Sequence, residues 1–412
     1  MVQDKEVNHN IVYLTHVVVV VLVAMATDLS LMGFTWPELW LQFQTPYNMM
    51  KPRTQTPPVV FLKTHKTGSS TVQNLLFRMG ERDRATFAFP HHSYQFSYPE
   101  KYGAVILHSP YSQKVQHNMR LDVEQLKQVM PENAVYITIL REPLRTFESV
   151  FSYYTSTVPS ALSLFLESPD AFWDPKEPGN CLGRNPMSFD LGIDSQQWNT
   201  TWRTDLSLLE ETFQLVMIAE HFDESLILLG SLLDLNMEEL AYVRLNTRSL
   251  QDVTHLDDDT KDQISAWNTL DVLLYDFFLQ IFLEKVEKYG LERLNSEVAL
   301  LRATTNRIRR KCVARSGVYP EELEDLVRPW QTDTVTILGY QIQKNLTKPE
   351  QAFCTRLVLP ELQYHAHLYF QVLHVPWKPT KNKECFGLPP MIPMQLCSVK
   401  SLCGEETSCQ TL

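Results

Sequence analysis

The stretch that decides the fold runs from residue 59 to residue 71 and reads Val59-Val60-Phe61-Leu62-Lys63-Thr64-His65-Lys66-Thr67-Gly68-Ser69-Ser70-Thr71. Its first four residues are apolar and predict a short buried strand. The segment from Ser70 to Met79 predicts a helix, which Gly80 would end in the C′ position. A strand, a polar turn and a helix in this order are typical of an α/β domain.

Similar units recur along the chain. Strands are predicted at Ala104–Leu107, Val135–Leu140 and Phe213–Ala219. Helices are predicted at Leu121–Met130 before Pro131, after Pro143, at Asp223–Leu233 and through most of Asp259–Lys311, where an apolar stripe at helical spacing indicates a core-facing surface. We therefore expect one α/β domain at residues 58–375, with a central, mostly parallel sheet flanked by helices.

The composition excludes several classes of protein. The 412 residues include 37 Lys and Arg against 48 Asp and Glu, a net charge of −11, and 44% are hydrophobic. This is the composition of an ordinary globular protein and not of a disordered chain. A net negative chain is also a poor candidate for binding nucleic acid, which requires a broad basic surface. A local basic pocket for a small anion remains compatible with it.

The N-terminus predicts attachment to a membrane. Residues 11–34 are mostly apolar and long enough for a signal anchor, which would leave residues 1–10 as a cytoplasmic tail and residues 35–57 as a stem. A cleaved signal peptide is the second interpretation, because Ala24-Met25-Ala26 fits a small-x-small cleavage site. A buried core segment is the third. The flanking charges do not decide the orientation.

Other features agree with a secretory compartment. Asn199 and Asn345 begin glycosylation acceptor tripeptides, and seven cysteines allow disulfides with at least one left over. Their spacing does not form a zinc site, so we expect no metal. Residues 376–412 form a Cys- and Pro-rich tail in which we expect little regular structure.

The turn inside residues 59–71 predicts a phosphate site. A turn between a strand and a helix points backbone N–H groups and the positive helix end at one place. Gly68 allows close approach, Lys63 and Lys66 supply positive charge, and four residues supply hydroxyls: Thr67, Ser69, Ser70 and Thr71. The alternative is a simple helix N-cap. The turn is not a Walker A loop, because Lys66 precedes Gly68.

A second candidate site for a phosphate follows the next strong strand. Arg141 stands at the end of Val135–Leu140, where open α/β sheets bind ligands. Ser149 lies about two turns into the helix that follows. An arginine fork and a hydroxyl that converge suit a second phosphate. Taken alone, Arg141 could equally be a structural ion-pairing residue.

Together, these two segments resemble the 5′-phosphosulfate loop and the 3′-phosphate site of sulfotransferases that use 3′-phosphoadenosine 5′-phosphosulfate (PAPS). Residues 58–375 resemble, more narrowly, the Golgi galactose 3-O-sulfotransferases. The segments that carry the narrower resemblance are Arg184-Asn185 with Phe189-Asp190-Leu191-Gly192, residues 216–225, Ala266-Trp267-Asn268 with Asp271 and Tyr275, and residues 360–364. The resemblance implies a type II Golgi membrane protein with a lumenal domain. It would sulfate the 3-hydroxyl of a terminal β-galactose on a glycoprotein or glycolipid, without metal, and we also consider a homodimer.

The resemblance implies in-line sulfuryl transfer, in which Lys66 stabilises the leaving phosphate and a histidine acts as the base. His117 stands where the family usually has the first of two adjacent histidines, but Asn118 replaces the second. His108 is the other candidate for the base. Arg120 could bind the acceptor or pair with an acid.

Three other functions stay open. A glycosaminoglycan sulfotransferase usually needs a strongly basic groove, which the net charge disfavours. A kinase with a degenerate phosphate loop would show Mg²⁺-dependent ATP binding. A Golgi homologue with weakened or lost catalysis is suggested by Asn118.

Overall fold

The structure is a computed structural model that describes residues 18–19, 57–85, 87, 120–177, 180–193 and 198–372. The predicted strand at residues 104–107, the tail at 376–412, His108 and His117 lie outside the described residues. So does the predicted anchor, apart from Val18 and Val19. No helix in the described part of the chain is both long and apolar enough to cross a membrane.

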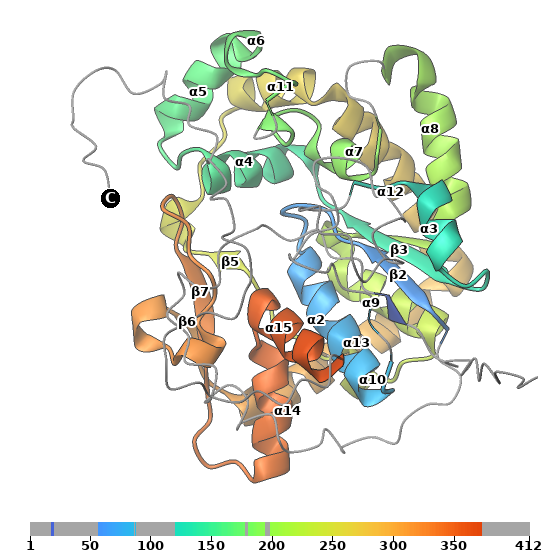
Figure 1. Ribbon diagram of the computed structural model, residues 1–412, viewed down its shortest axis with the longest axis vertical. Coiled ribbons are helices and arrows are strands. Elements are labelled where there is room, and N and C mark those ends of the chain that lie inside the picture. The colour runs from blue at the N-terminus through green and yellow to red at the C-terminus, as the bar shows by residue number, and fades with distance from the viewer. Residues whose placement is uncertain are drawn as a thin grey trace, which may run out of the picture.

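The core of the domain is a parallel sheet of four strands in the order β1-β2-β3-β4 (Figure 1). The strands are β1 (Val18–Val19), β2 (Val59–Leu62), β3 (Val135–Leu140) and β4 (Leu215–Ile218). The side chains of β2 and β4 are buried throughout, as expected for a parallel sheet covered on both faces. The α/β fold class is therefore confirmed, and three of the predicted strands are present, with β4 slightly shorter than expected.

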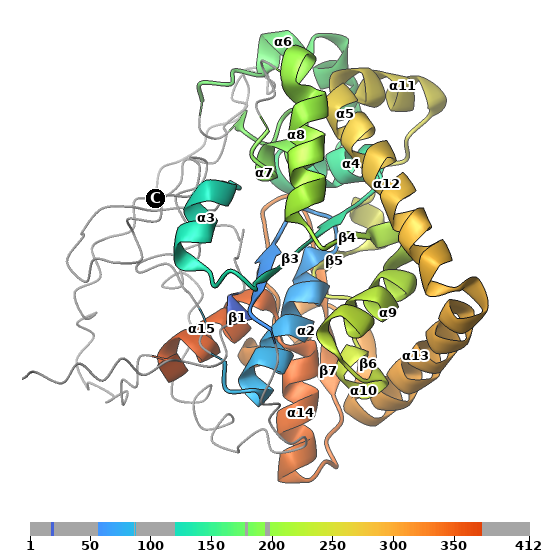
Figure 2. The same cartoon turned by 90° about the vertical axis from the view of Figure 1, so that its right-hand side faces the viewer.

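Helices cover both sides of this sheet. In Figure 2, one group lies above the sheet and a second group below it. The upper group includes α4 (Pro143–Tyr154), α5 (Pro159–Glu167), α6 (Pro169–Phe172), α7 (Pro186–Asp190), α8 (Trp198–Thr212), α11 (Asp258–Trp267) and α12 (Thr269–Tyr289). The lower group includes α2 (Ser69–Arg82), α9 (Phe222–Leu233), α10 (Met237–Leu240), α13 (Leu291–Cys312), α14 (Lys348–Val358) and α15 (Glu361–Val372), while α3 (Val123–Val129) precedes β3.

Two features differ from what the sequence predicts. Helix α2 does not end at Gly80 but continues to Arg82. A side chain at Gly80 would lie 2.4 Å from the ring of Phe87, so this glycine makes room for the ring and does not cap the helix. The second feature is a small antiparallel sheet of β5 (Thr247–Arg248), β7 (Ile337–Ile342) and β6 (Val313–Val318), which we did not predict.

A buried ionic cluster joins α2 to α14 and α15. Glu81 accepts two hydrogen bonds from Arg356, at 2.7 and 2.8 Å, and one from the hydroxyl of Tyr364 at 2.9 Å. Nε2 of His367 lies 3.0 Å from the same carboxylate. Burial opposes the charge of Glu81, but the bonds from Arg356 and His367 outweigh burial and hold the pKa of Glu81 well below its usual value. The cluster fixes the two last helices against α2.

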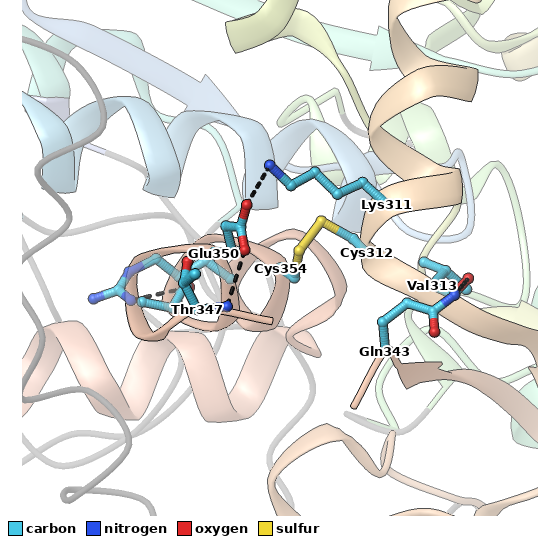
Figure 3. Close-up of a disulfide and its surroundings, with 9 residues drawn as sticks. Lys311, Cys312, Val313, Gln343, Thr347, Glu350 and Cys354 are labelled. Carbon is cyan, nitrogen blue, oxygen red and sulfur yellow. Dashed lines mark hydrogen bonds and ion pairs between the residues drawn. A yellow bond between two sulfur atoms is a disulfide. The ribbon is translucent and has the colours of Figure 1, made fainter. Parts of the chain in front are cut away.

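A disulfide makes a second connection in the same region. Cys312, at the end of α13, is bonded to Cys354 on α14, and both are fully buried (Figure 3). Lys311 and Glu350 form an ion pair of 2.7 Å beside it. The bond closes a loop across a sequence separation of 42 residues, which includes β6 and β7 of the small antiparallel sheet but not β5.

We expect the double substitution Cys312→Ala/Cys354→Ala to lower the free energy of unfolding by about 4 kcal/mol, because a loop of this length loses much of its entropy when it is closed. Urea unfolding of both proteins without reductant measures the difference. Cys181→Ser, which lies outside this disulfide, is the matched control. Equal unfolding midpoints for the wild type and the double variant would contradict the assigned bond.

Candidate functional site

The loop between β2 and α2 lies at the carboxyl edge of the sheet. The hydroxyl of Thr64 donates to the carbonyl of Ile139 on β3 at 2.5 Å, and the hydroxyl of Thr138 donates to the carbonyl of Leu62 at 2.8 Å. Lys66 and Gly68 both adopt left-handed backbone conformations, with φ of 58° and 86°. A side chain at Gly68 would meet no atom within 4 Å, so this position favours glycine for its φ alone.

The four predicted hydroxyls all contact the protein. Those of Thr67 and Ser69 donate to the carbonyl of Thr64, at 3.2 and 2.7 Å, and so brace the loop. The hydroxyl of Ser70 donates to Glu361 at 2.8 Å. The hydroxyl of Thr71 accepts from the backbone N–H of Leu245 at 3.0 Å. Thr67 and Ser69 therefore stabilise the shape of the loop. The groups of the loop suited to bind an anion are the positive charges of Lys63 and Lys66 and the backbone N–H groups.

The ammonium of Lys66 is the central group of the site. It is buried, has no hydrogen-bond partner among the described residues and lies 3.7 Å above the ring of Tyr153. Burial lowers the pKa of Lys66 well below its usual value, and neighbouring positive charges lower it further. Those neighbours are Arg248, Lys63 and Arg141. A buried ammonium without a partner, surrounded by cations, suits an anionic ligand with several charges.

Arg141 joins the two predicted phosphate segments. It follows β3, and its guanidinium donates to the backbone carbonyl of Lys66 at 3.0 Å. Its backbone N–H contacts the sulfur of Met187 at 3.5 Å. Ser149, on the helix that Arg141 precedes, is only 2% exposed. Burial lowers the pKa of Arg141 below its usual value. The structure thus brings Arg141 to the loop of Lys66, whereas the predicted pairing of Arg141 with Ser149 on a second phosphate stays a prediction.

Arg248 is a cation of this site that sequence reasoning missed. Its guanidinium donates to both carboxylate oxygens of Glu148, at 3.0 and 2.7 Å. Burial opposes the charge of Glu148, but the bonds from Arg248 outweigh it, so the pKa of Glu148 lies below its usual value. Arg248 stands on the short strand β5, more than 100 residues after the motif it joins. The sequence feature that could have indicated such a cation is Glu148, an acid directly before Ser149 in the helix α4.

His65 is held by a carboxylate. Its Nδ1 lies 2.9 and 3.0 Å from the two oxygens of Asp190, and its backbone N–H donates to the same side chain at 2.7 Å. Asp190 is fully buried at the end of α7. It therefore sets both the backbone and the ring orientation of the residue next to Lys66.

Helix α7 is itself held by α12. Asp271 accepts hydrogen bonds from the backbone N–H groups of Met187 and Ser188, at 3.1 and 2.8 Å. Asn268 accepts from the backbone N–H of Asn185 at 2.7 Å. Burial raises the pKa of Asp271 to about 6, because its charged form is removed from water. Four residues from the segments that carried the sequence resemblance, Asn185, Asp190, Asn268 and Asp271, thus lie in or beside one helix that contacts the loop.

The segment that begins at Arg120 is anchored to the same helix. The backbone N–H of Leu121 donates to the carbonyl of Asp190 at 3.0 Å, and the guanidinium of Arg120 donates to the carbonyl of Ile193 at 2.8 Å. A side chain at Gly192 would lie 2.3 Å from the carbonyl of Leu121, so this glycine allows a close approach. Arg120 also lies over the ring of Phe189, at 4.5 Å.

The other predicted positions are partly described. Asn345 lies in an exposed loop between β7 and α14, and Asn199 lies in the first turn of α8. Lys63 is 3.4 Å from Glu361. Within the described ranges, no group of His, Cys, Asp and Glu is placed to hold a metal ion.

Comparison with known proteins shows the family of this chain. A family profile described as galactose-3-O-sulfotransferase matches residues 1–372. Human galactosylceramide sulfotransferase is 37% identical over 323 residues, which cover 74% of this chain and 76% of the relative. Human galactose-3-O-sulfotransferase 2 is 34% identical over 390 residues, covering 90% and 96%, and mouse galactose-3-O-sulfotransferase 3 is 35% identical over 357 residues, covering 81% and 82%. The chain therefore belongs to the galactose-3-O-sulfotransferase family.

Proposed function

We propose that this protein transfers a sulfuryl group from PAPS to the 3-hydroxyl of a terminal β-galactose on a glycoprotein or glycolipid. The observation that carries the proposal is the buried ammonium of Lys66, which has no hydrogen-bond partner in the described part of the chain. Lys66 lies in a loop at the carboxyl edge of a parallel sheet, and Arg141 contacts its backbone carbonyl. The names of the relatives support a galactose-containing acceptor. We further propose a type II Golgi membrane protein with a lumenal catalytic domain.

PAPS would supply a sulfuryl group and a phosphate that leaves with growing negative charge. Lys66 and the backbone N–H groups at the start of α2 would stabilise that charge where it develops. Arg141 and Ser149 would hold the 3′-phosphate, with Arg248 adding positive charge nearby. Like the binding of phosphate by arginine in general, this arrangement combines charge with directed hydrogen bonds.

We propose that His117 removes the proton of the acceptor hydroxyl. Support comes from the anchoring of Arg120 and Leu121 to α7, which also holds His65 beside Lys66. Three residues of chain span at most about 11 Å. Chain connectivity therefore limits how far position 117 can lie from the anchored Arg120.

The first test is transfer from sulfur-labelled PAPS to a panel of β-galactosides by the full-length chain, without added metal. We expect label on the galactose 3-position, with α-galactosides and β-glucosides unlabelled. Lys66→Met and Arg141→Ala should each lower transfer by roughly 100-fold or more, since each removes a charge that stabilises the transition state or holds the donor.

Lys127→Met is the matched control, because Lys127 forms an exposed ion pair on α3 far from the loop in sequence and should change nothing. Normal transfer in the Lys66 or Arg141 variant would contradict the two-phosphate assignment. PAPS binding without any transfer would instead support a homologue that has lost catalysis.

The second prediction concerns the base. His117→Ala should lower kcat by about 10²- to 10⁴-fold, as is usual for a lost general base, and leave the affinity for the donor unchanged. His108→Ala is the matched comparison and should retain most of the activity. The opposite result, with His108→Ala inactive and His117→Ala active, would transfer the role to His108.

The third prediction concerns protonation of Lys66. The pKa of Lys66 lies well below its usual 10.5. An anion bound beside Lys66 should raise this pKa, so that Lys66 takes up a proton when the anion binds. Affinity for 3′-phosphoadenosine 5′-phosphate, the spent donor, should therefore fall as pH rises through the lowered pKa. Calorimetry in buffers of different ionisation enthalpy, above pH 7.5, measures the uptake. Lys66→Arg should abolish it, and undiminished uptake in that variant would disprove the assignment.

A further inference from the structure

A carboxylate lies inside this cationic loop. Glu361 is the first residue of α15, and its Oε2 accepts the hydroxyl of Ser70 at 2.8 Å and lies 3.4 Å from the ammonium of Lys63. The side chains of Lys63 and Glu361 are 8% and 15% exposed. An anion in this position opposes the binding of a second anion, because like charges in a poorly hydrated site repel strongly.

Two buried polar atoms near this pair have no hydrogen-bond partner among the described residues. The other oxygen of Glu361, Oε1, is buried and has no hydrogen-bond partner among the described residues, as is also true of the ammonium of Lys66. The charge of Glu361 is the main negative influence on Lys66, against three cations. Leaving a buried carboxylate oxygen and a buried ammonium without hydrogen-bond partners costs free energy, unless a bound ligand rearranges the cluster.

Glu361 is not needed to attach α15 to the domain. Tyr364 and His367, one and nearly two turns further on, bind Glu81 of α2, and Gln363 donates to the carbonyl of Arg328 at 2.6 Å. Figures 1 and 2 both show α15 beside α2, and the two helices are in contact. These contacts hold the helix, so the carboxylate at its first residue is available for another role.

We propose that Glu361 is the internal counter-ion of the donor site: it pairs with Lys63 and Ser70 when the site is empty and yields both groups to the anionic end of the bound donor. The inference rests on the proposed function. Its consequence is that Glu361 weakens the affinity for the spent donor, which keeps both phosphates of the donor and must leave after each turnover.

The test is the affinity of the full-length chain for 3′-phosphoadenosine 5′-phosphate, measured by calorimetry. Glu361→Gln keeps the shape and an oxygen that can accept from Ser70, but it removes the charge. We expect this variant to bind the bisphosphate at least about fivefold more tightly, because a like charge has been removed from the site. Glu321→Gln, an exposed residue of the short 3-10 helix Pro320–Glu322, is the matched control and should bind as the wild type does.

A double-mutant cycle identifies the partner. Lys63→Met should weaken binding more in the Glu361→Gln background than in the wild type, because Glu361 neutralises part of the charge of Lys63. Additive effects of the two substitutions would disprove the pairing. Unchanged or weaker binding by Glu361→Gln, or a lower kcat at unchanged affinity, would overturn the proposal and assign the carboxylate to support or to proton transfer.

A second measurement needs no variant. In a structure of the wild type with the bisphosphate bound, the distance between the Lys63 ammonium and Glu361 Oε2 should exceed 4 Å, and an ion pair that persists would overturn the proposal. If the wild type binds no bisphosphate at all, the proposed function fails. If it binds and Glu361→Gln binds equally, only this inference fails.

Discussion

The structure depends on how it keeps several positive charges together at one edge of a sheet. Lys63, Lys66, Arg141 and Arg248 lie close together at this edge. After burial, the charges of Arg248, Lys63 and Arg141 lower the pKa of Lys66, and the charge of Arg248 also lowers the pKa of Arg141. Two buried acids offset this repulsion: Glu148 holds Arg248 with two hydrogen bonds, and Glu361 lies beside Lys63. Among the described residues, no acid forms a hydrogen bond with the ammonium of Lys66. The least balanced positive charge is therefore at Lys66, where an anionic ligand would gain the most binding free energy.

The geometry of the loop is set from the opposite side of the sheet. Asp271 on α12 holds the start of α7, and Asp190 at the end of α7 holds His65. The loop that carries Lys66 is therefore fixed through two buried carboxylates that lie outside the loop. Buried networks of this kind are strong when every member is satisfied. They also explain why short motifs more than 80 residues apart carry the family resemblance: their residues touch.

The sequence predicts the part of this arrangement that local rules control. Strands β2 and β3 were predictable from continuous apolar runs, and the loop of Lys66 was predictable from its place between a strand and a helix. Residues whose roles depend on distant partners were not predictable. Arg248 and Glu361 reach the site through the folding of later segments, and the pairing of Cys312 with Cys354 follows from the docking of α14. The prediction that Gly80 ends α2 is wrong because this glycine makes room for the ring of Phe87, a residue that follows the end of the helix.

The last helices connect stability to the site. Helix α14 is joined to α13 by the disulfide, and α14 and α15 together bury Glu81 of α2 through Arg356, Tyr364 and His367. The same helix, α2, carries Ser70 at its other end, where it meets Glu361. The contacts at the far end of α2 thus determine where the first residue of α15 lies relative to the loop. Because a carboxylate acts over a few ångströms in a poorly hydrated site, the charge balance around Lys66 depends on helices that the chain adds only after residue 347.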